Sequence, residues 1–410
     1  MEHWGIFTNN QTNKKELVKK LENNAFSNII NLDGQKGKLF SQLALQKFME
    51  EEEKHGTKSI STEFQALKTM SSGEQKKALL FQILDQDPDY IILDNPFDNL
   101  DVTFQKELRK LLTKHADRTL FIQLASRKAD MLSMIHNFAE VRDGQLDILK
   151  EIALKQDKKQ IHLSGEIPSP INQISFNGNT LISFKNVNVS YGEKHILKDI
   201  DWEVKSGEFW QLIGHNGTGK TTILSMITGD NPKAFGQEIY LFGKKKGSGE
   251  SVWDIKQKIG YFSPSMTDKF RGRHSLENML ISGLLDSIGL YVKPTETQKR
   301  IIKNWLLLIH LWEKRNIQFN ELSLGEQRLV MTVRAMVKHP PLLILDEPTS
   351  GMDDSAARIL VNLVNKIAEE TQTAILFVSH RKEPGLHPKK ILELTKTEKG
   401  SLGSIHTFKK

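Results

Sequence analysis

The sequence of 410 residues contains no cysteine, which excludes disulfides, thiolate zinc sites and a cysteine nucleophile. It also lacks any apolar run near the roughly 18 residues that a membrane-spanning helix needs. Residues 1–20 have no apolar core of the kind that defines a secretion signal. We therefore expect a cytoplasmic protein, with peripheral attachment at the inner membrane as an alternative, and we assign any membrane span to another chain. The net charge of +7 is small for this length and is typical of a solvated basic surface.

The most informative stretch follows the apolar run Phe209–Ile213. It reads Gly214, His215, Asn216, Gly217, Thr218, Gly219, Lys220, Thr221 and Thr222. A strand, a glycine-rich turn and a helix are the setting of a phosphate-binding loop, so all of these residues are candidate nucleotide contacts. The glycines allow consecutive backbone N–H groups to point at a phosphate. Lys220 is expected to reach the β- and γ-phosphates, and Thr221 to place a hydroxyl on Mg²⁺.

A second feature is an internal repeat. The pattern Ser-x-Gly-Glu-Gln occurs twice, beginning at Ser71 and at Ser323, and each copy is followed by an apolar strand that ends in an aspartate. Ser71 precedes Asp94 by 23 residues, and Ser323 precedes Asp346 by 23 residues. The repeat predicts an α/β protein made of two tandem copies of one unit.

The first copy is expected to be damaged. A short strand at Trp4–Phe7 and a lysine-rich helix near Lys14–Leu21 precede residues 33–39, which resemble a phosphate loop. This stretch keeps Gly37-Lys38 but has Leu39 where the Mg²⁺-binding hydroxyl belongs. We interpret it as a degenerate phosphate loop.

Spacing predicts that the first copy is also truncated. Its loop lysine precedes the Ser-x-Gly-Glu-Gln serine by 33 residues, against 103 in the second copy, so about 70 residues are missing. We predict a degenerate first domain at 1–149, a polar, proline-containing linker at 150–180 and a complete second domain at 181–410. Within the second domain, Leu276–Leu311 is expected to be a helical subdomain, and Lys244–Lys246 a solvated turn.

Acidic and histidine side chains follow the apolar strands of the second copy, and each suits a step of nucleotide hydrolysis. Asp346 can hold Mg²⁺ through water, Glu347 can polarise the attacking water, and His380 can contact the γ-phosphate. Ser323-Leu324-Gly325 at a helix start offers a second anion site. A lone strand-end carboxylate is often only a cap, and a lone histidine is often structural, but the ordered set favours catalysis.

This ordered set resembles the ATP-binding cassette (ABC) ATPases. The resemblance rests on Gly214–Thr222, Leu322–Gln327, Leu342–Pro348 and His380, and it covers both copies. It implies two tandem P-loop ABC-type domains that bind ATP and Mg²⁺. It also implies that Tyr191 stacks on adenine, although a strand aromatic in the core is the alternative.

Further stretches outside the shared motifs resemble the ModF/PhrA family of tandem cassette proteins. They are Trp253–Lys256, Ile281–Gly283, Asp286–Gly289 and Arg334–Pro340. That family is named for the molybdate transport system, so the resemblance implies a transport-linked or regulatory ATPase.

The sequence departs from the cassette pattern in two places. Ser263-Pro264-Ser265 stands where most cassettes have a glutamine that senses Mg²⁺ and contacts a membrane partner. In the first copy, Leu39, Asn95 and Arg127 replace the Mg²⁺ hydroxyl, the catalytic acid and the histidine. The first departure weakens the inference of a permease partner, and the second predicts little or no turnover in the first copy.

Cassettes of this class pair head to tail, so the resemblance implies that one phosphate loop faces an opposing Ser-x-Gly-Glu-Gln segment. The first copy keeps that segment, so Ser71 and Gly73 are candidate contacts to the ATP bound by the second copy, unless they merely cap a helix. A membrane importer subunit and a ribosome-binding ABC-F factor are alternative functions, and nucleic acid is left open as a partner. The sequence does not determine the cargo, the signal sensed or the partner protein. It also does not determine whether the first domain binds nucleotide, or whether the working site forms within one chain or between two chains.

Overall fold

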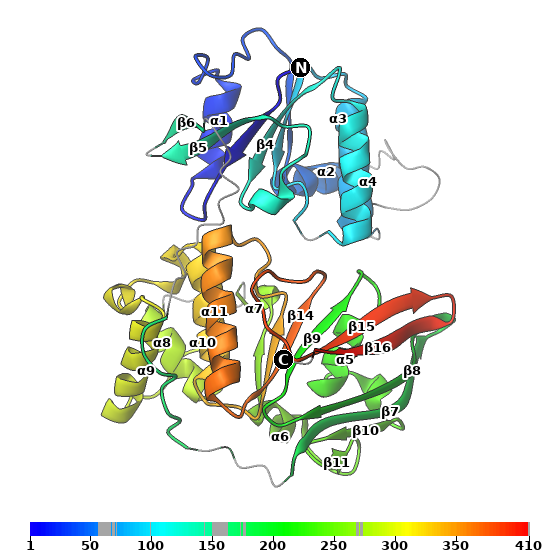
Figure 1. Ribbon diagram of the computed structural model, residues 1–410, viewed down its shortest axis with the longest axis vertical. Coiled ribbons are helices and arrows are strands. Elements are labelled where there is room, and N and C mark those ends of the chain that lie inside the picture. The colour runs from blue at the N-terminus through cyan, green and yellow to red at the C-terminus, as the bar shows by residue number, and fades with distance from the viewer. Residues whose placement is uncertain are drawn as a thin grey trace. The chain divides into compact units, whose positions relative to one another are not determined.

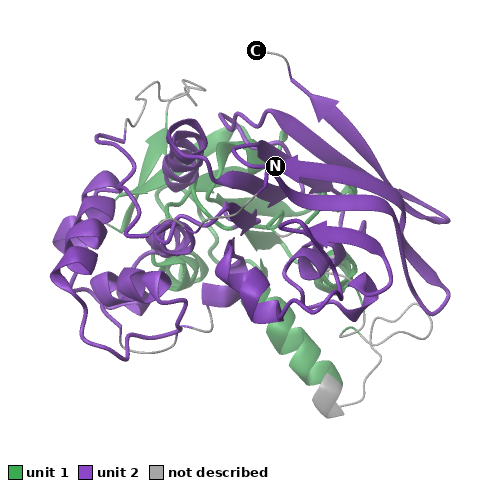
Figure 2. Ribbon diagram, turned by 90° about the horizontal axis from the view of Figure 1, so that it is seen from below, with its two compact units in different colours: residues 1–160, 351–354 green, residues 161–350, 355–410 purple. Residues whose placement is uncertain are grey.

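The computed structural model describes residues 1–55, 67, 70, 72–98, 100–142, 144–149, 163–172, 174, 178–267, 270 and 274–408. The chain forms two compact units, which Figure 2 distinguishes by colour. Unit 1 comprises residues 1–160 and 351–354, and unit 2 comprises residues 161–350 and 355–410. Ser71, one of the candidate site residues, lies outside the described residues.

Unit 2 is built on one mixed sheet, with ten strands among the described residues, in the order β11-β10-β7-β8-β16-β15-β9-β14-β13-β12 (Figure 1). These strands are β7 (Thr180–Tyr191), β8 (Lys194–Lys205), β9 (Phe209–Gly214), β10 (Glu238–Leu241), β11 (Lys244–Lys245), β12 (Ile259–Phe262), β13 (Leu342–Asp346), β14 (Ala374–Ser379), β15 (Lys390–Thr397) and β16 (Gly400–Thr407). The neighbours from β15 to β12 are parallel, whereas β7 pairs antiparallel with β8 and β10. The continuous apolar sequences of β13 and β14 are buried, as expected for parallel strands covered on both faces.

The helices of unit 2 include the predicted helical subdomain. They are α5 (Lys220–Ile227), α6 (Val252–Gln257), α7 (Pro264–Thr267), α8 (Leu276–Leu284), α9 (Glu296–Leu308), α10 (Leu324–Met336) and α11 (Asp354–Glu370). The prediction of helices within Leu276–Leu311 is confirmed by α8 and α9. Thr295 begins α9 and Ser323 begins α10 with capping boxes, in which a serine or threonine and a side chain three residues later satisfy each other's backbone N–H groups.

The core of unit 2 joins its antiparallel and parallel strands. Phe184, Trp202 and Trp210 stack edge to face, with ring centroids 6.1 and 5.6 Å apart, so β7, β8 and β9 share one apolar cluster. Ile223 and Leu224 of α5 are buried in the same cluster. The helix that follows the glycine-rich loop is therefore anchored by its apolar face.

Unit 1 contains a smaller sheet in the order β2-β3-β4-β1-β5-β6. Its strands are β1 (Trp4–Phe7), β2 (Gly37–Phe40), β3 (Tyr90–Asp94), β4 (Leu120–Ala125), β5 (Asn137–Arg142) and β6 (Gln145–Leu149). Its helices are α1 (Lys14–Glu22), α2 (Gln42–His55), α3 (Ser72–Leu84) and α4 (Val102–Lys114), and a 3₁₀ turn spans Lys128–Asp130. The predicted strand at Trp4–Phe7 and helix near Lys14–Leu21 are thus confirmed.

The sheet of unit 1 follows the same strand order as part of the sheet of unit 2. The series β2-β3-β4-β1-β5-β6 matches β12-β13-β14-β9-β15-β16, and every neighbouring pair has the same relative direction. In this match, β1 corresponds to β9, and the helix after it, α1, corresponds to α5.

The prediction of a phosphate loop at residues 33–39 is wrong. Gly37, Lys38 and Leu39 lie on β2, which pairs in parallel with β3, so they take the place of β12. The connection that corresponds to the loop of unit 2 is residues 8–13, between β1 and α1. Lys14 precedes Ser71 by 57 residues, so the deficit relative to the 103 of unit 2 is smaller than expected.

Parts of the predicted linker and of the basic run make closer contacts than their polar composition suggests. Within 163–172, the backbone N–H of Ile167 donates to Glu370, and the Pro168 carbonyl lies 2.7 Å from the Nε2 atom of His339. In the basic run, Lys246 is buried, with its Nζ 3.3 Å from Glu250 and 5.2 Å from the Phe235 ring centroid. The prediction of a solvated turn is therefore wrong for Lys246, because a carboxylate and an aromatic face compensate for its burial.

Replacing Gly260 tests the close packing between β12 and α10. A Cβ at this position would lie 2.1 Å from the Ala335 carbonyl oxygen, a backbone atom that cannot move aside alone. We expect Gly260→Ala to reduce the free energy of unfolding by about 1–3 kcal/mol, the usual cost of overpacking. The matched control is Gly403→Ala, whose Cβ would meet a leucine methyl at 3.1 Å. Urea denaturation that gives equal stability for both variants would contradict this packing.

Candidate nucleotide-binding site

The loop between β9 and α5 has the backbone geometry that its glycines predict. Gly217 and Gly219 have φ angles of +76° and +95°, which side chains strongly disfavour. A Cβ on Gly219 would also lie 2.6 Å from Leu197 of β8, and one on Gly214 would lie 2.6 Å from the Thr218 hydroxyl. At both 214 and 219, neighbouring atoms leave no room for a side chain, so glycine is required. At 219 the positive φ angle requires glycine as well.

The side chains of the loop divide into buried supports and exposed contacts. Thr218 is fully buried, and its hydroxyl donates to the His215 carbonyl at 2.8 Å, which closes the loop. His215 and Asn216 are exposed, as is Thr221 in the first turn of α5, whereas Thr222 is partly buried. Gly219 provides no side-chain cap for α5, so the helix N-terminus can offer its N–H groups to an anion.

Lys220 lies back across the loop. Its Nζ donates to the Gly214 carbonyl at 2.6 Å and to the His215 carbonyl at 3.2 Å. The residue is buried, so its ammonium is held over the loop where the phosphates of a nucleotide would lie.

The parallel strands bring the predicted acids to the same edge of the sheet as the loop. Ile213 of β9 is paired with Ser379 of β14, and Val378 is paired with Asp346 of β13, so all three strands end at one level. Glu347 has a φ of +46°, and its backbone N–H donates to the Val378 carbonyl at 2.8 Å. The chain therefore turns directly after Asp346, the last residue of β13.

His380 is brought to Glu347 by the end of β14. Its Nδ1 lies 3.5 Å from Glu347 Oε1, and both side chains are largely buried. The predicted grouping of Lys220, Asp346, Glu347 and His380 is therefore present in the structure of unit 2.

The two neighbouring acids are shifted in opposite directions. Burial and the charge of Glu347 raise the pKa of Asp346 to about 6, against the opposing effect of Lys220. Burial also raises the pKa of Glu347, but the His380 hydrogen bond and the positive charges of His380, Lys220 and Arg381 outweigh it and lower this pKa. Glu347 is thus kept ionised. For Asp346, the positive charge of Lys220 is too weak to offset the effect of burial, so the pKa of Asp346 stays raised.

The oxygen donors here suit Mg²⁺. The carboxylate of Asp346 and the hydroxyl of Thr221 are hard oxygen ligands, and Mg²⁺ sites typically use one or two such groups together with substrate phosphates and water. The raised pKa of Asp346 is consistent with a site that is completed by a cation.

Other predicted site residues have structural contacts of their own. The Tyr191 ring is 45% exposed, so it is not a core aromatic, and its hydroxyl accepts from Asn231 at 2.9 Å. The Ser323 hydroxyl donates to Glu326 at 2.9 Å at the start of α10. Gly73 is buried in α3, and a Cβ there would lie 2.5 Å from the Phe104 ring, a packing role that the sequence did not suggest.

One residue pair that sequence reasoning missed lies at the same edge of the unit 1 sheet. Lys14 begins α1, as Lys220 begins α5, and its Nζ lies 2.8 Å from Asp94 at the end of β3. Residues 8–13 contain no glycine, so no motif marks them as a phosphate-loop equivalent. The usable signal was the order of strand, short connection and lysine at the helix start.

This fold and site define an ABC-type ATPase. The family model described as "ABC transporter" matches residues 197–350. The chain is 36% identical to "ABC transporter ATP-binding protein ModF" of Escherichia coli (strain K12), over 77% of this chain and 67% of that protein. The chain therefore belongs to the ABC transporter ATP-binding protein family, and it is an ATP hydrolase of that class.

Two further relatives show the range of the similarity. The chain is 31% identical to "Uncharacterized ABC transporter ATP-binding protein C323.04" of Schizosaccharomyces pombe (strain 972 / ATCC 24843), over 77% of this chain and 66% of that protein. It is 33% identical to "Zinc uptake system ATP-binding protein ZurA" of Listeria innocua serovar 6a, over 49% of this chain and 77% of that protein. The chain thus spans about two thirds of the length of ModF and of the Schizosaccharomyces pombe protein. No helix among the described residues is both long and apolar enough to cross a membrane.

The raised pKa of Asp346 predicts how stability depends on pH when Mg²⁺ and nucleotide are absent. The folded pKa of about 6 lies above the ordinary 3.8, so the native state holds the proton more tightly and loses stability as pH rises from about 4 to 6. We expect Asp346→Asn to have a higher Tm than the wild type above about pH 7, with the difference shrinking below pH 4. The exposed Asp33→Asn is the control, and a pH-independent Tm difference for Asp346→Asn would contradict the shift.

Proposed function

We propose that unit 2 hydrolyses ATP with Mg²⁺ at the edge where β9, β13 and β14 end. The observation that supports this most directly is the grouping of the phosphate loop, Asp346, Glu347 and His380 at one level of a parallel sheet. Tyr191, exposed at the end of β7, is the proposed adenine contact. Gly214–Thr222 are the proposed phosphate contacts.

In this proposal the side chains act by positioning and by charge. Glu347 stays ionised and accepts a proton from the attacking water, while His380 holds Glu347 in place and contacts the γ-phosphate. Lys220 and the N–H groups of the loop stabilise the negative charge on the phosphates. Thr221 and Asp346 would hold Mg²⁺, and the ion would supply further neutralisation of the phosphate charge.

We further propose that unit 1 is a truncated and degenerate cassette. The strand order of unit 1 supports this proposal. Asn95 supports it as well, because its φ of +43° and the hydrogen bond from its backbone N–H to the Leu124 carbonyl match those of Glu347, whose N–H bonds to the Val378 carbonyl. The Asn95 side chain accepts from the Ser126 N–H at 3.1 Å, and an amide cannot act as a general base. The expectation that Arg127 replaces the histidine is wrong: Leu124 pairs with Asp94 as Val378 pairs with Asp346, so Ser126 takes the place of His380.

The connection of unit 1 supports a loss of nucleotide binding. The Asn9 and Thr12 side chains bond within residues 9–12, so N–H groups of this connection are satisfied locally. Asn13 accepts from the Glu16 N–H and caps α1, and the Glu16 carboxylate in the first turn repels an anion. Lys14 is paired with Asp94, so the lysine expected to bind phosphate already has a partner.

The retained segment Met70–Gln75 is the proposed second contributor to the ATP site of unit 2. This assignment rests on the resemblance, in which each ATP meets a Ser-x-Gly-Glu-Gln segment of another cassette. Ser71 and Gly73 would then contact the γ-phosphate. In the alternative, Ser323 and Gly325 of a second chain take this role.

The proposed biological role is ModF-like, in a molybdate-transport-related or regulatory setting. The 36% identity to ModF supports this role. Cytoplasmic ATP turnover without a membrane partner is the simplest form, with a permease-bound importer subunit or an ABC-F-like ribosome factor as alternatives. Copurification from the native cell tests the role, because a molybdate permease, a zinc permease or ribosomal proteins would each identify a different one.

Glu347→Gln tests the assignment of the general base. The amide keeps the shape of the side chain but cannot accept the proton, so we expect ATP binding to persist and turnover to fall about 10²–10⁴-fold. Lys220→Ala should weaken ATP binding and leave little turnover, because unit 1 contributes none. Phosphate release and ATP binding are measured for both variants. Unchanged turnover in Glu347→Gln, or residual activity of Lys220→Ala that Lys14→Ala abolishes, would refute the assignment.

Ser71→Arg and Ser323→Arg test which segment completes the site. A bulky cation at the γ-phosphate position blocks closure only where that segment is used, so we expect Ser71→Arg to abolish hydrolysis and Ser323→Arg to be milder. Turnover per chain should be independent of protein concentration, because a tether fixes the effective concentration of the segment. The opposite ranking, with activity rising on concentration, would establish a two-chain dimer instead.

A further inference from the structure

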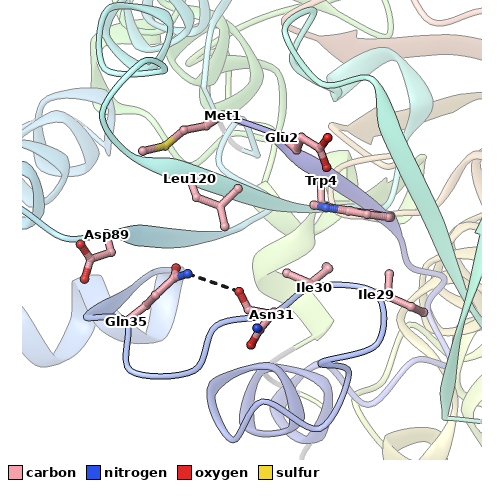
Figure 3. A pocket seen from close by; sticks show the side chains of 9 residues that line it. All are labelled: Met1, Glu2, Trp4, Ile29, Ile30, Asn31, Gln35, Asp89 and Leu120. Carbon is pink, nitrogen blue, oxygen red and sulfur yellow. Dashed lines mark hydrogen bonds between the residues drawn. The ribbon is translucent and has the colours of Figure 1, made fainter.

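A cavity of about 450 Å³ lies in unit 1, at the amino ends of the strands and so opposite the edge that corresponds to the nucleotide site. It is lined by Met1, Glu2, Trp4, Ile29, Ile30, Asn31, Gln35, Asp89 and Leu120 (Figure 3). In Figure 3, Ile29, Ile30 and Gln35 come from the segment after α1, and Trp4 and Leu120 come from the sheet. Polar and apolar side chains both line it, and its volume lies in the range of roughly 300–1,000 Å³ that small-molecule pockets have.

In unit 2, the ammonium group of Lys390 lies at the place that corresponds to this pocket. There, the Glu208 carboxylate accepts from the indole N–H of Trp210 at 2.7 Å and from the Lys390 ammonium at 2.6 Å. The same ammonium lies 5.1 Å from the centroid of the Trp210 ring, a cation–π distance. Burial would raise the pKa of Glu208, but the bonds from Lys390, Trp210 and the Lys205 N–H lower it, so this carboxylate stays ionised.

Unit 1 keeps the acid and the aromatic ring but has no lysine at the strand position of Lys390. Because β1 corresponds to β9, Glu2 and Trp4 take the places of Glu208 and Trp210, with the same spacing between them. Lys390 is the strand neighbour of Trp210, and the strand neighbour of Trp4 is Asn137. Glu2 is exposed, and within the described part of the chain its carboxylate forms no ion pair or hydrogen bond.

We propose that this pocket binds a small organic ammonium ion, whose positive charge takes the place that Lys390 occupies in unit 2. The ring of Trp4 and the carboxylate of Glu2 would contact the cation, and Ile29, Ile30 and Leu120 would contact its apolar part. Asp89 adds negative charge at the rim, although its carboxylate already accepts from the Lys36 N–H at 2.7 Å. Binding here does not depend on ATP hydrolysis, because the pocket lies at the other end of the strands.

Choline and its neutral isostere 3,3-dimethylbutan-1-ol form the first test, with the full chain titrated by ligand-observed NMR. They share shape and apolar area and differ in charge, so choline should bind at least about tenfold more tightly, a difference of about 1.4 kcal/mol. Glu2→Gln and Trp4→Leu should each abolish that preference. Asp85→Asn, which removes an exposed carboxylate of unit 1 outside the pocket, should leave it unchanged.

Asn137→Lys is the second test, and it does not rely on losing a contact. The new ammonium should reach Glu2 and Trp4 as Lys390 reaches Glu208 and Trp210, so it should raise the Tm and prevent choline binding. Asn137→Gln is the uncharged control and should leave choline binding in place. The proposal is overturned if the wild type does not bind choline, if the neutral isostere binds equally well, or if Glu2→Gln or Asn137→Lys leaves choline binding unchanged.

Discussion

The candidate nucleotide site of unit 2 depends on the close approach of its glycine-rich loop to β8. Gly219 has a φ of +95°, and a side chain there would collide with Leu197 and Ile196 of β8. The lack of a side chain lets α5 begin directly beside the antiparallel strands, with its first N–H groups unoccupied by a cap. Lys220 and Thr221 are placed by that helix start, so the main binding groups of the site depend on one steric constraint.

Unit 1 lacks that constraint, and its corresponding helix start is built differently. The part of unit 1 that the structure describes has no strands in the places of β7 and β8, so nothing there requires a glycine before α1. Asn13 stands in that position and caps the helix, and Lys14 pairs with Asp94. These contacts stabilise the unit locally, and they use the groups that an ATP molecule would need. The proposed loss of nucleotide binding in unit 1 thus follows from these local contacts.

The charges around the two adjacent acids of unit 2, Asp346 and Glu347, shift their pKa values in opposite directions. Glu347 lies against His380, whereas the charge of Lys220 does not offset the burial of Asp346, so their pKa values move in opposite directions. Neighbouring acids with opposed shifts are a common arrangement where one holds a cation and the other accepts a proton. Glu347 begins the left-handed turn after β13 and lies 3.5 Å from His380, whereas Asp346 is the last residue of the strand.

Sequence reasoning alone located the glycine-rich loop between β9 and α5, the strand that ends at Asp346 and the recurring Ser-x-Gly-Glu-Gln pattern, because each of these is encoded within a few consecutive residues. It misjudged Gly37 and Lys38, since a glycine–lysine pair looks the same on a strand as in a loop, and pairing with β3 is needed to distinguish them. It also misjudged Lys246, whose burial depends on Glu250 and on Phe235 from another part of the chain.

The segment of unit 1 that corresponds to the glycine-rich loop of unit 2 was identified from the tertiary structure, because no glycine marks it in the sequence. Strand order established this correspondence, and strand order depends on hydrogen bonds between residues more than 100 positions apart, such as those that place β1 beside β4. The pocket at Glu2 and Trp4 emerged in the same way, because the residue that differs from unit 2, Asn137, reaches Trp4 through a neighbouring strand. Local chemistry can be determined from sequence, whereas the partners of each group are set by long-range pairing.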